Sequence, residues 1–323
     1  MSGTAIIFGG TGYIGSRLAR RLRESGFTEV ILADIKPLNE SLGDDIVYLK
    51  CDVRKSILEQ IGSRRVDWIF NFAAIHREPG HQFREYFDTN IPGAKNVCAY
   101  ADVIGCSNIL FTSSIAVYGE IHQQTDETME TYPDTGYGIS KLCAELIHEG
   151  WQSRGDGRRV LIVRPGVVYG PGDPGNILRL IRAIKQRVFL MPGDGSVRKS
   201  YAYIYGLLDC FEFLMNRPDA CVNCNYVERD TKPLSVLVTD IKSVLEIGGP
   251  ILRLPLPILV FVAKLIQFVT AGRSSIHPVR VMKASHSTHI IPGVLIKMGF
   301  EFQYEFLKSL KHWKGIEPAD FSF

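Results

Sequence analysis

No strong excess of one charge marks this sequence. It carries 37 Lys and Arg against 34 Asp and Glu in 323 residues, a formal net charge of +3 at pH 7. Proteins that coat nucleic acid usually show a pronounced basic excess. We therefore expect no nucleic-acid partner, while a small anionic ligand stays compatible because a few local cations suffice to hold it.

Cysteine and histidine form no regular pattern. An odd number of cysteines at irregular spacing does not make a disulfide framework, and the lone Cys221-Val-Asn-Cys224 has no second pair to complete a zinc site. His277, His286 and His289 match no zinc spacing either. We expect no metal and a reducing compartment, the cytoplasm. The seven cysteines are Cys51, Cys98, Cys106, Cys143, Cys210, Cys221 and Cys224.

A long uninterrupted hydrophobic run is also missing. The first residues show no cationic start followed by an apolar signal stretch. The most apolar segment runs from Ile251 to Ala271, and it contains several interruptions, so we expect no integral membrane segment. A buried or half-buried helix over Pro257–Thr270 is the preferred interpretation, and an interfacial helix is the alternative. The interruptions are Arg253, Pro255, Pro257, Lys264 and Gln267.

The first half of the chain alternates short apolar runs with helical patterns. Such alternation predicts βαβ units and, with right-handed crossovers, an α/β fold with a Rossmann-type doubly wound parallel sheet. Strands are expected over Thr4–Phe8, Glu29–Ala33, Ile46–Lys50, Asp67–Phe72, Asn108–Thr112 and Arg159–Arg164. Helices are expected over Tyr13–Ser25, up to Ile61, over Ile91–Ile104 and over Gly136–Ser153.

After Arg164 the pattern changes. The Gly- and Pro-rich stretch Pro165–Gly175 predicts a loop, and helices are expected over Asn176–Gln186 and near Tyr304–Trp313. The stretch Tyr201–Asn216 predicts a strand followed by a helix. We expect residues 1–170 to form the first domain, with 201–216 returning to it, and residues 171–200 and 217–323 to form a smaller C-terminal α/β lobe that binds substrate.

A glycine-rich turn, Gly9-Gly-Thr-Gly12-Tyr-Ile-Gly15, joins the first predicted strand to the first predicted helix. One glycine permits the tight turn, one lets the backbone approach a pyrophosphate, and one lets helix and strand pack closely. The phosphates then face free N–H groups at the positive end of the helix. The first domain is thus expected to bind a dinucleotide through Gly9, Thr11, Gly12, Tyr13, Ile14 and Gly15.

Asp34 ends the second predicted strand and bears on the choice of dinucleotide. A carboxylate there accepts hydrogen bonds from ribose hydroxyls and repels a 2′-phosphate, so NAD is the expected cofactor, although the nearby Lys36 weakens the argument. A solvated loop carboxylate is the alternative. Further cofactor contacts are expected from residues that follow the other strands: Asp52, Val53, Ala73 and Ala74.

Tyr137-Gly-Ile-Ser-Lys141 opens the predicted long helix, and its i, i+4 spacing places both side chains on one face. Hydride transfer at a carbinol carbon needs a proton moved at the oxygen. A free tyrosine, with a pKa near 10, is a poor base at neutral pH, but a lysine cation within about 4–6 Å favours the phenolate. Alone, this pattern is also common on ordinary amphipathic helices.

Thr112-Ser113-Ser114 follows the fifth predicted strand, at the edge where open α/β sheets bind ligands. A serine hydroxyl in this stretch can bond the substrate oxygen while Tyr137 exchanges its proton.

These pieces resemble the extended short-chain dehydrogenases/reductases, and within them the NAD-dependent epimerase/dehydratase family that acts on nucleotide sugars. The resemblance implies that Ser114, Tyr137 and Lys141 are catalytic, that Lys141 also binds the nicotinamide ribose, and that Asn90, Pro165 and Val167 are further NAD contacts. The matching pieces are Gly9–Gly15, Asp34, Asp52-Val53, Asn71–Ala74, Thr89-Asn90, Ser113–Gly119, Tyr137–Lys141 and Arg164–Pro171.

The resemblance also implies a nucleotide-diphosphate sugar as partner and a possible homodimer. Tyr169 would border sugar and nicotinamide, and Asn176 would contact the diphosphate. His76 lies where the family often contacts substrate, although a loop histidine without a role is an equal alternative. The cationic candidates for the diphosphate are Arg198, Lys199 and Arg280, each of which is also open to interpretation as a solvated surface charge.

Two departures from the family pattern narrow the chemistry. The 4,6-dehydratases carry an Asp-Glu pair after the catalytic threonine, whereas Ile115 and Ala116 stand here and transfer no protons, so dehydration is disfavoured. The run Arg198–Gly206 lacks the usual acidic pair, and its arginine is either replaced by Lys199 or displaced to Arg198. Substrate binding is therefore expected to differ from that of the common epimerases.

The leading hypothesis is an NAD-dependent nucleotide-sugar 4-epimerase or 4-keto reductase, with hydride transfer at C4 and Tyr137 as acid and base. Asp34 favours the epimerase, because biosynthetic reductases more often use NADPH. The alternative is a 3β-hydroxysteroid- or lipid-type dehydrogenase of the same superfamily, which the apolar Leu254–Val269 suggests. A third possibility, a non-catalytic NAD-sensing or scaffold protein, is disfavoured by the intact catalytic set.

Overall fold

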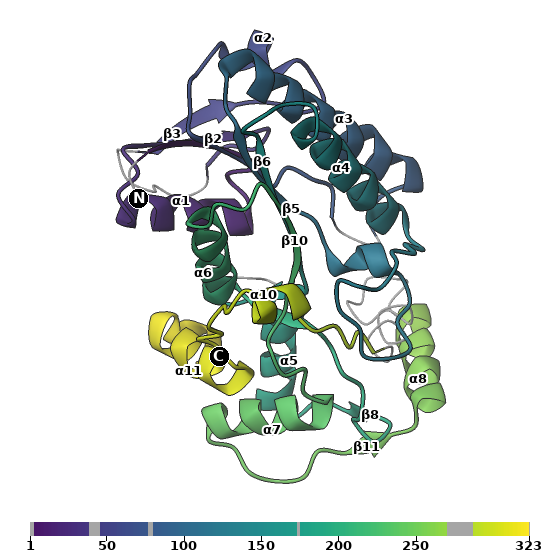
Figure 1. The fold of residues 1–323 in the computed structure, drawn as a ribbon. Helices are drawn as coiled ribbons and strands as arrows, with labels where there is room; N and C mark the ends of the chain where they lie inside the picture. The colour runs from purple at the N-terminus through teal and green to yellow at the C-terminus, as the bar shows by residue number, and fades with distance from the viewer. Residues whose placement is uncertain (1–2, 39–45, 77–79, 173–174, 270–286, 323) are drawn as a thin grey trace.

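A seven-stranded parallel sheet organises the computed structural model, which describes residues 3–38, 46–76, 80–172, 175–269 and 287–322. The strand order is β10-β6-β5-β4-β1-β2-β3, so the chain winds outward from β1 in both directions (Figure 1). This confirms the predicted Rossmann-type sheet. The strands are β1 (Thr4–Phe8), β2 (Glu29–Asp34), β3 (Ile46–Lys50), β4 (Trp68–Asn71), β5 (Asn108–Thr112), β6 (Arg159–Pro165) and β10 (Cys221–Tyr226).

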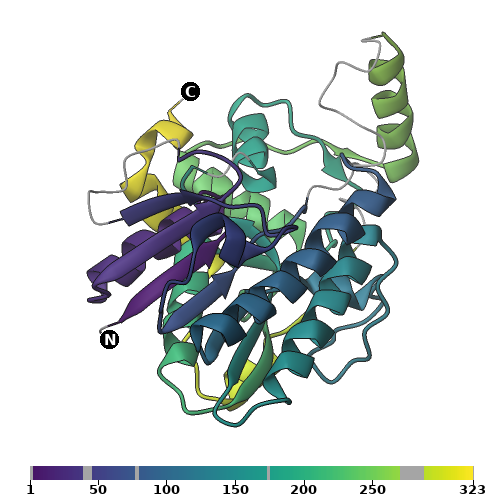
Figure 2. The same cartoon turned by 90° about the horizontal axis from the view of Figure 1, so that it is seen from above.

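Helices cover both faces of this sheet. Along β1, Ala5 and Ile7 pack with α1 (Tyr13–Glu24) and α6 (Ile204–Met215), whereas Ile6 and Phe8 pack on the opposite side. That second side is covered by α2 (Ile57–Ile61), α3 (Phe83–Ile104) and α4 (Gly136–Gln152), as Figure 2 shows from above. The strands are thus apolar on both faces, as a doubly covered parallel sheet requires.

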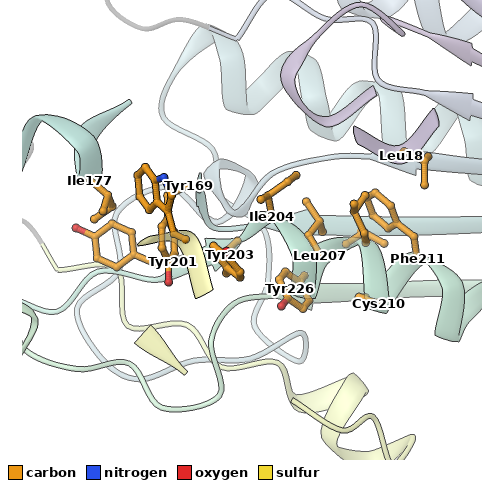
Figure 3. Close-up of a cluster of buried hydrophobic side chains, with 14 of the residues drawn as sticks. Leu18, Tyr169, Ile177, Tyr201, Tyr203, Ile204, Leu207, Cys210, Phe211 and Tyr226 are labelled. Carbon is orange, nitrogen blue, oxygen red and sulfur yellow. The ribbon is translucent and has the colours of Figure 1, made fainter. Parts of the chain in front are cut away.

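Smaller elements continue the core beyond the sheet. The strand β7 (Val167–Tyr169) pairs with β9 (Tyr201–Tyr203), and β8 (Met191–Pro192) pairs with β11 (Arg253–Leu254). Figure 3 shows Tyr169, Tyr201 and Tyr203 continuing the row of apolar side chains that α6 presents. The remaining elements are η1 (Ile115–Tyr118), α5 (Asn176–Lys185), α7 (Leu234–Leu245), α8 (Leu256–Val269), α10 (Gly293–Lys297), α11 (Phe306–Ile316) and η2 (Pro318–Phe321).

The structure differs from the sequence prediction in three elements. The helix expected from Ile91 begins at Phe83, where the Glu85 carboxylate accepts the N–H of Gln82 at 3.1 Å and caps the first turn. Pro92 lies inside this helix and does not mark its start. The loop expected over 165–175 contains β7. The strand β10 pairs with β6 in the central sheet, although the sequence analysis assigned its residues to the second lobe.

A buried ion pair joins the sheet to α4. The guanidinium of Arg164 on β6 donates to both carboxylate oxygens of Glu145 on α4, at 2.9 and 2.7 Å. It also donates to the hydroxyl oxygen of Tyr118 at 2.9 Å, and that hydroxyl donates to Asn225 on β10. Because every partner is buried, the network holds α4 in one position against the sheet.

We predict that Glu145→Ala lowers the free energy of unfolding by about 3–5 kcal/mol, because it leaves the buried charge of Arg164 without a partner. Urea-induced unfolding measures the loss. The control is Asp219→Ala, which removes an exposed partner of Arg217 and is expected to cost under about 1 kcal/mol. Equal losses in the two variants would contradict this account.

Candidate active site

The glycine-rich turn lies against the end of β4. Gly9 has φ +74°, and a Cβ added to it would lie 2.6 Å from the backbone nitrogen of Ala73. A Cβ on Gly15 would lie 2.7 Å from the carbonyl oxygen of Gly9. Only glycine permits this packing. The turn therefore brings the first amides of α1 to the carboxyl edge of the sheet, which is the geometry that a dinucleotide pyrophosphate needs.

Asp34 lies beside this turn, at the end of β2. Its two carboxylate oxygens accept the backbone N–H of Thr11 at 3.2 Å and of Lys36 at 3.1 Å. These bonds orient the carboxylate and leave it further acceptor capacity for ribose hydroxyls.

Two other predicted cofactor residues follow β3. Both carboxylate oxygens of Asp52 bind the Arg54 guanidinium, at 2.9 and 2.7 Å, and this hydrogen bonding lowers the pKa of Asp52. Val53 is buried under α3, where Asn96 donates to its carbonyl oxygen at 2.7 Å. Arg54 thus holds Asp52 in place after β3, and Val53 packs against Gly93 of α3.

Asn90 connects the end of β4 to α4. Its amide oxygen accepts the N–H of Ile75 at 2.9 Å, and its amide nitrogen donates to the hydroxyl of Ser140 at 2.8 Å. Ala73 and Ala74, predicted to lie against the cofactor, are half-buried just before Ile75. With its polar atoms engaged inside the protein, Asn90 positions the helix that carries Tyr137 and Lys141.

Lys141 is the most enclosed member of the predicted catalytic set. Its Nζ donates to the carbonyl oxygen of Thr112 at 2.5 Å and lies 4.4 Å from the centroid of the Phe111 ring. Burial lowers the pKa of Lys141 to about 7, an effect that the Glu145 carboxylate partly offsets. The amine is therefore poised to change charge near neutral pH.

Tyr137 and Ser114 are half-buried at the same edge of the sheet. Tyr137 lies one helical turn before Lys141, with its ring centroid 6.2 Å from that of Tyr86. The hydroxyl oxygen of Ser114 accepts the N–H of Ala116 at 3.1 Å, which caps η1. Because Gly138 on α4 has no side chain, the first turn of α4 packs directly on the carbonyl oxygen of Ala116. The structure thus brings the elements of the three catalytic candidates together.

The cofactor and substrate contacts predicted at the end of β6 and in β7 differ in how deeply they are buried. Pro165 is buried and Val167 half-buried at the junction of β6 and β7. Tyr169 is 0% exposed, its ring packs on Phe306, and its hydroxyl donates to Glu228. Its role as a substrate contact stays a prediction, and in this structure the side chain is packed in the core.

The substrate candidates lie on separate segments. Asn176 is exposed at the start of α5, with its amide oxygen accepting from Arg179 at 2.8 Å. The guanidinium of Arg198 donates to the carbonyl oxygen of Thr231. The backbone of Lys199 forms an isolated parallel β-bridge with that of Thr288. His76 is exposed after β4. The candidate Arg280 and the histidines His277 and His286 lie outside the described residues.

One buried histidine near the site was missed by the sequence analysis. The His148 ring stacks on Phe111 with centroids 4.4 Å apart, and its Nε2 lies 3.3 Å from the amide nitrogen of Asn71. Its spacing of seven residues from Lys141 on one helix is the signal that would have placed both on the face toward the sheet. Burial lowers the pKa of His148 to about 4, so it supports Phe111 as a neutral ring.

Two kinds of feature are missing from the part of the chain that the structure describes. None of its helices combines the length and hydrophobicity needed to cross a bilayer. Nor does it gather three or more His, Cys, Asp or Glu side chains into an arrangement fit for a metal ion.

Comparison with known proteins adds sequence and structural relatives. Residues 5–226 match the sequence model described as the NAD dependent epimerase/dehydratase family. The chain is 26% identical to N-acetyl-α-D-glucosaminyl-diphospho-ditrans,octacis-undecaprenol 4-epimerase of Escherichia coli O157:H7, over 96% of this chain and 98% of the relative.

Solved structures share the fold. A UDP-glucose 4-epimerase of Thermotoga maritima with UDP-glucose has a TM-score of 0.77 at 19% identity, with 98% of this chain and 99% of that chain covered. A Bordetella bronchiseptica enzyme in complex with NAD and UDP has a TM-score of 0.76 at 15% identity, with 99% and 96% covered.

We predict different consequences for two glycines of the turn. Gly9→Ala forces a side chain into the left-handed region and against Ala73, and is expected to cost about 1–3 kcal/mol of unfolding free energy. Gly12→Ala, at φ −73°, is expected to fold but to bind NAD about tenfold more weakly, because its methyl group crowds the phosphates. Urea unfolding and calorimetric NAD titration measure the two effects, and unchanged NAD affinity in Gly12→Ala would contradict this placement.

Lys141 predicts a rise of stability with pH. The unfolded chain keeps the lysine proton up to its ordinary pKa of 10.5, whereas the ligand-free native state releases it above about 7. Between these values the unfolded state binds more protons, so unfolding free energy rises by roughly 1 kcal/mol per pH unit. Lys141→Met is the control, because it lacks this contribution. Denaturation at pH 7.5, 8.5 and 9.5 gives the difference, and parallel curves for the two proteins would refute it.

Proposed function

Because the chain belongs to the NAD dependent epimerase/dehydratase family of enzymes, we propose that it interconverts the C4 epimers of a diphosphate-linked hexose or hexosamine. The observation that supports this proposal is the packing of the first turn of α4, which carries Tyr137 and Lys141, on η1, which Ser114 caps, at the sheet edge that also holds the glycine turn. The likeness to a 4-epimerase along nearly the whole of both chains supports C4 as the reacting carbon.

The residues of the turn fit an NAD molecule. The close packing of Gly9 on Ala73 clears space in front of the α1 amides for a pyrophosphate, and Asp34 is oriented to accept ribose hydroxyls. We assign the nicotinamide ribose to Lys141. Bound there, NAD supplies reversible removal of hydride from a carbinol carbon.

Tyr137 moves the proton that this chemistry requires. In our proposal its phenolate oxygen takes the proton from the C4 hydroxyl and returns it once hydride has reached the other face of the sugar. Lys141 in its charged form stabilises the phenolate, and the Ser114 hydroxyl donates to the same C4 oxygen. Ile115 and Ala116, which follow Ser114, carry no group for the elimination of water, so dehydration is not part of the proposal.

The next part of the proposal concerns the group to which the sugar is linked through its diphosphate. We propose a nucleotide diphosphate, as the sequence predicts, with Asn176, Arg198 and Lys199 as candidates to meet its phosphates. A polyprenyl diphosphate is the second candidate, and the substrate in the name of the Escherichia coli relative favours it. A cytoplasmic location and a homodimer stay predictions.

We predict that Tyr137→Phe lowers kcat by about 10²–10⁴-fold while NAD affinity changes little, because the variant removes only the proton-transfer group. The assay supplies UDP-glucose or UDP-N-acetylglucosamine to the purified chain and measures the C4 epimer by NMR and net NADH by absorbance. Ser114→Ala, expected to lose less activity, is the matched variant.

The outcomes separate the candidate reactions. C4 epimer without net NADH supports the epimerase. A parallel assay supplies a UDP-4-keto sugar together with NADH, and net NADH consumption there without any epimerisation of the UDP-sugars would assign a reductase instead. Full activity in Tyr137→Phe would overturn the proposed role of the phenol.

A further inference from the structure

The helix α8 is apolar and lies away from the core. It spans 14 residues, LPILVFVAKLIQFV, and follows the short strand β11. Figures 1 and 2 both place it at the periphery, and in Figure 2 it stands clear of the sheet and its covering helices. None of its described side chains is buried: Ile258 is 47% exposed and Phe261 is 66% exposed. An apolar helix in this position leaves a hydrophobic surface without a described partner.

The charge of the surrounding sequence indicates what covers that surface. From Ile247 to Phe300 there is no Asp or Glu, although the whole chain of 323 residues has 34. The same stretch carries only cations, of which Arg253, Lys264 and Lys297 are exposed. The others are Arg273, Arg280 and Lys283, known here from the sequence alone. Along the sequence these cations complement a surface that is apolar within and anionic at its rim, and Lys264 places one of them on α8 itself.

The dimensions favour a helix that lies along a bilayer rather than across it. At 1.5 Å per residue, 14 residues reach about 21 Å, less than the hydrocarbon core of about 30 Å. Lys264 lies in the middle of the helix and is exposed, so its amine suits the headgroup level.

We propose that α8 docks this enzyme on a membrane surface bearing anionic lipid headgroups, with Ile258 and Phe261 inserted at the interface. The docking does not depend on the proposed reaction. A second copy of the chain is the rival occupant of the same apolar surface.

The test is co-sedimentation of the full chain with vesicles of equal parts phosphatidylcholine and phosphatidylglycerol, and with phosphatidylcholine alone. We expect binding to the mixed vesicles, weaker binding to the neutral ones, and loss of binding at high salt. Phe261→Glu is expected to weaken partitioning by about tenfold or more. The control Leu58→Glu puts the same charge on an exposed apolar site of α2 and is expected to bind like the unchanged chain.

Two results would overturn the docking. One is a chain that stays in the supernatant with the mixed vesicles. The other is a loss of self-association in Phe261→Glu by analytical ultracentrifugation, without any effect on lipid binding. Epimerisation of a water-soluble UDP-sugar, assayed in parallel, keeps the two proposals apart. Activity without vesicle binding rejects only the docking, and vesicle binding that depends on α8 without activity rejects only the reaction.

Discussion

The site depends on a buried amine at the carboxyl end of a strand. A lysine ammonium in the core is costly unless a fixed acceptor faces it, and here the carbonyl of Thr112 at the end of β5 supplies one at 2.5 Å. This bond holds α4 against the sheet, and the ion pair between Arg164 on β6 and Glu145 on α4 joins the same two elements. The packing of α4 therefore also places Tyr137, one turn earlier on the same helix.

Around that bond, the parallel sheet gathers groups from distant parts of the chain. The glycine turn follows β1, Asp34 ends β2, and Ser114 follows β5, so all three reach one edge because all the strands run the same way. Asn90 links the segment after β4 to α4 through Ser140. An edge that carries the α1 amides, the Asp34 carboxylate, Tyr137 and Lys141 offers the residue types that the proposed hydride chemistry at a carbinol carbon needs.

Local sequence patterns predicted most of the helices and strands around the site. They did not predict contacts between residues that are distant in the sequence. The strand Thr4–Phe8, the glycine turn and the helix carrying Tyr137 and Lys141 follow from periodicity and turn chemistry within a few residues. The pairing of β10 with β6 did not, since nothing local distinguishes a strand of the sheet from one beside it. Pro92 made the sequence prediction begin α3 about two turns too late. The burial of Tyr169 was not predicted either, because it depends on Phe306 and Glu228, which are distant in sequence.

In the proposed reaction, hydride leaves and returns at C4 while only a proton passes through Tyr137. Substrate carrying deuterium at C4 tests this most directly, with the product analysed by mass spectrometry and NMR. The account predicts that the epimerised product keeps the deuterium at C4 and that none appears in water. Release of the label to solvent would show that C4 loses a proton instead, and would contradict the central claim.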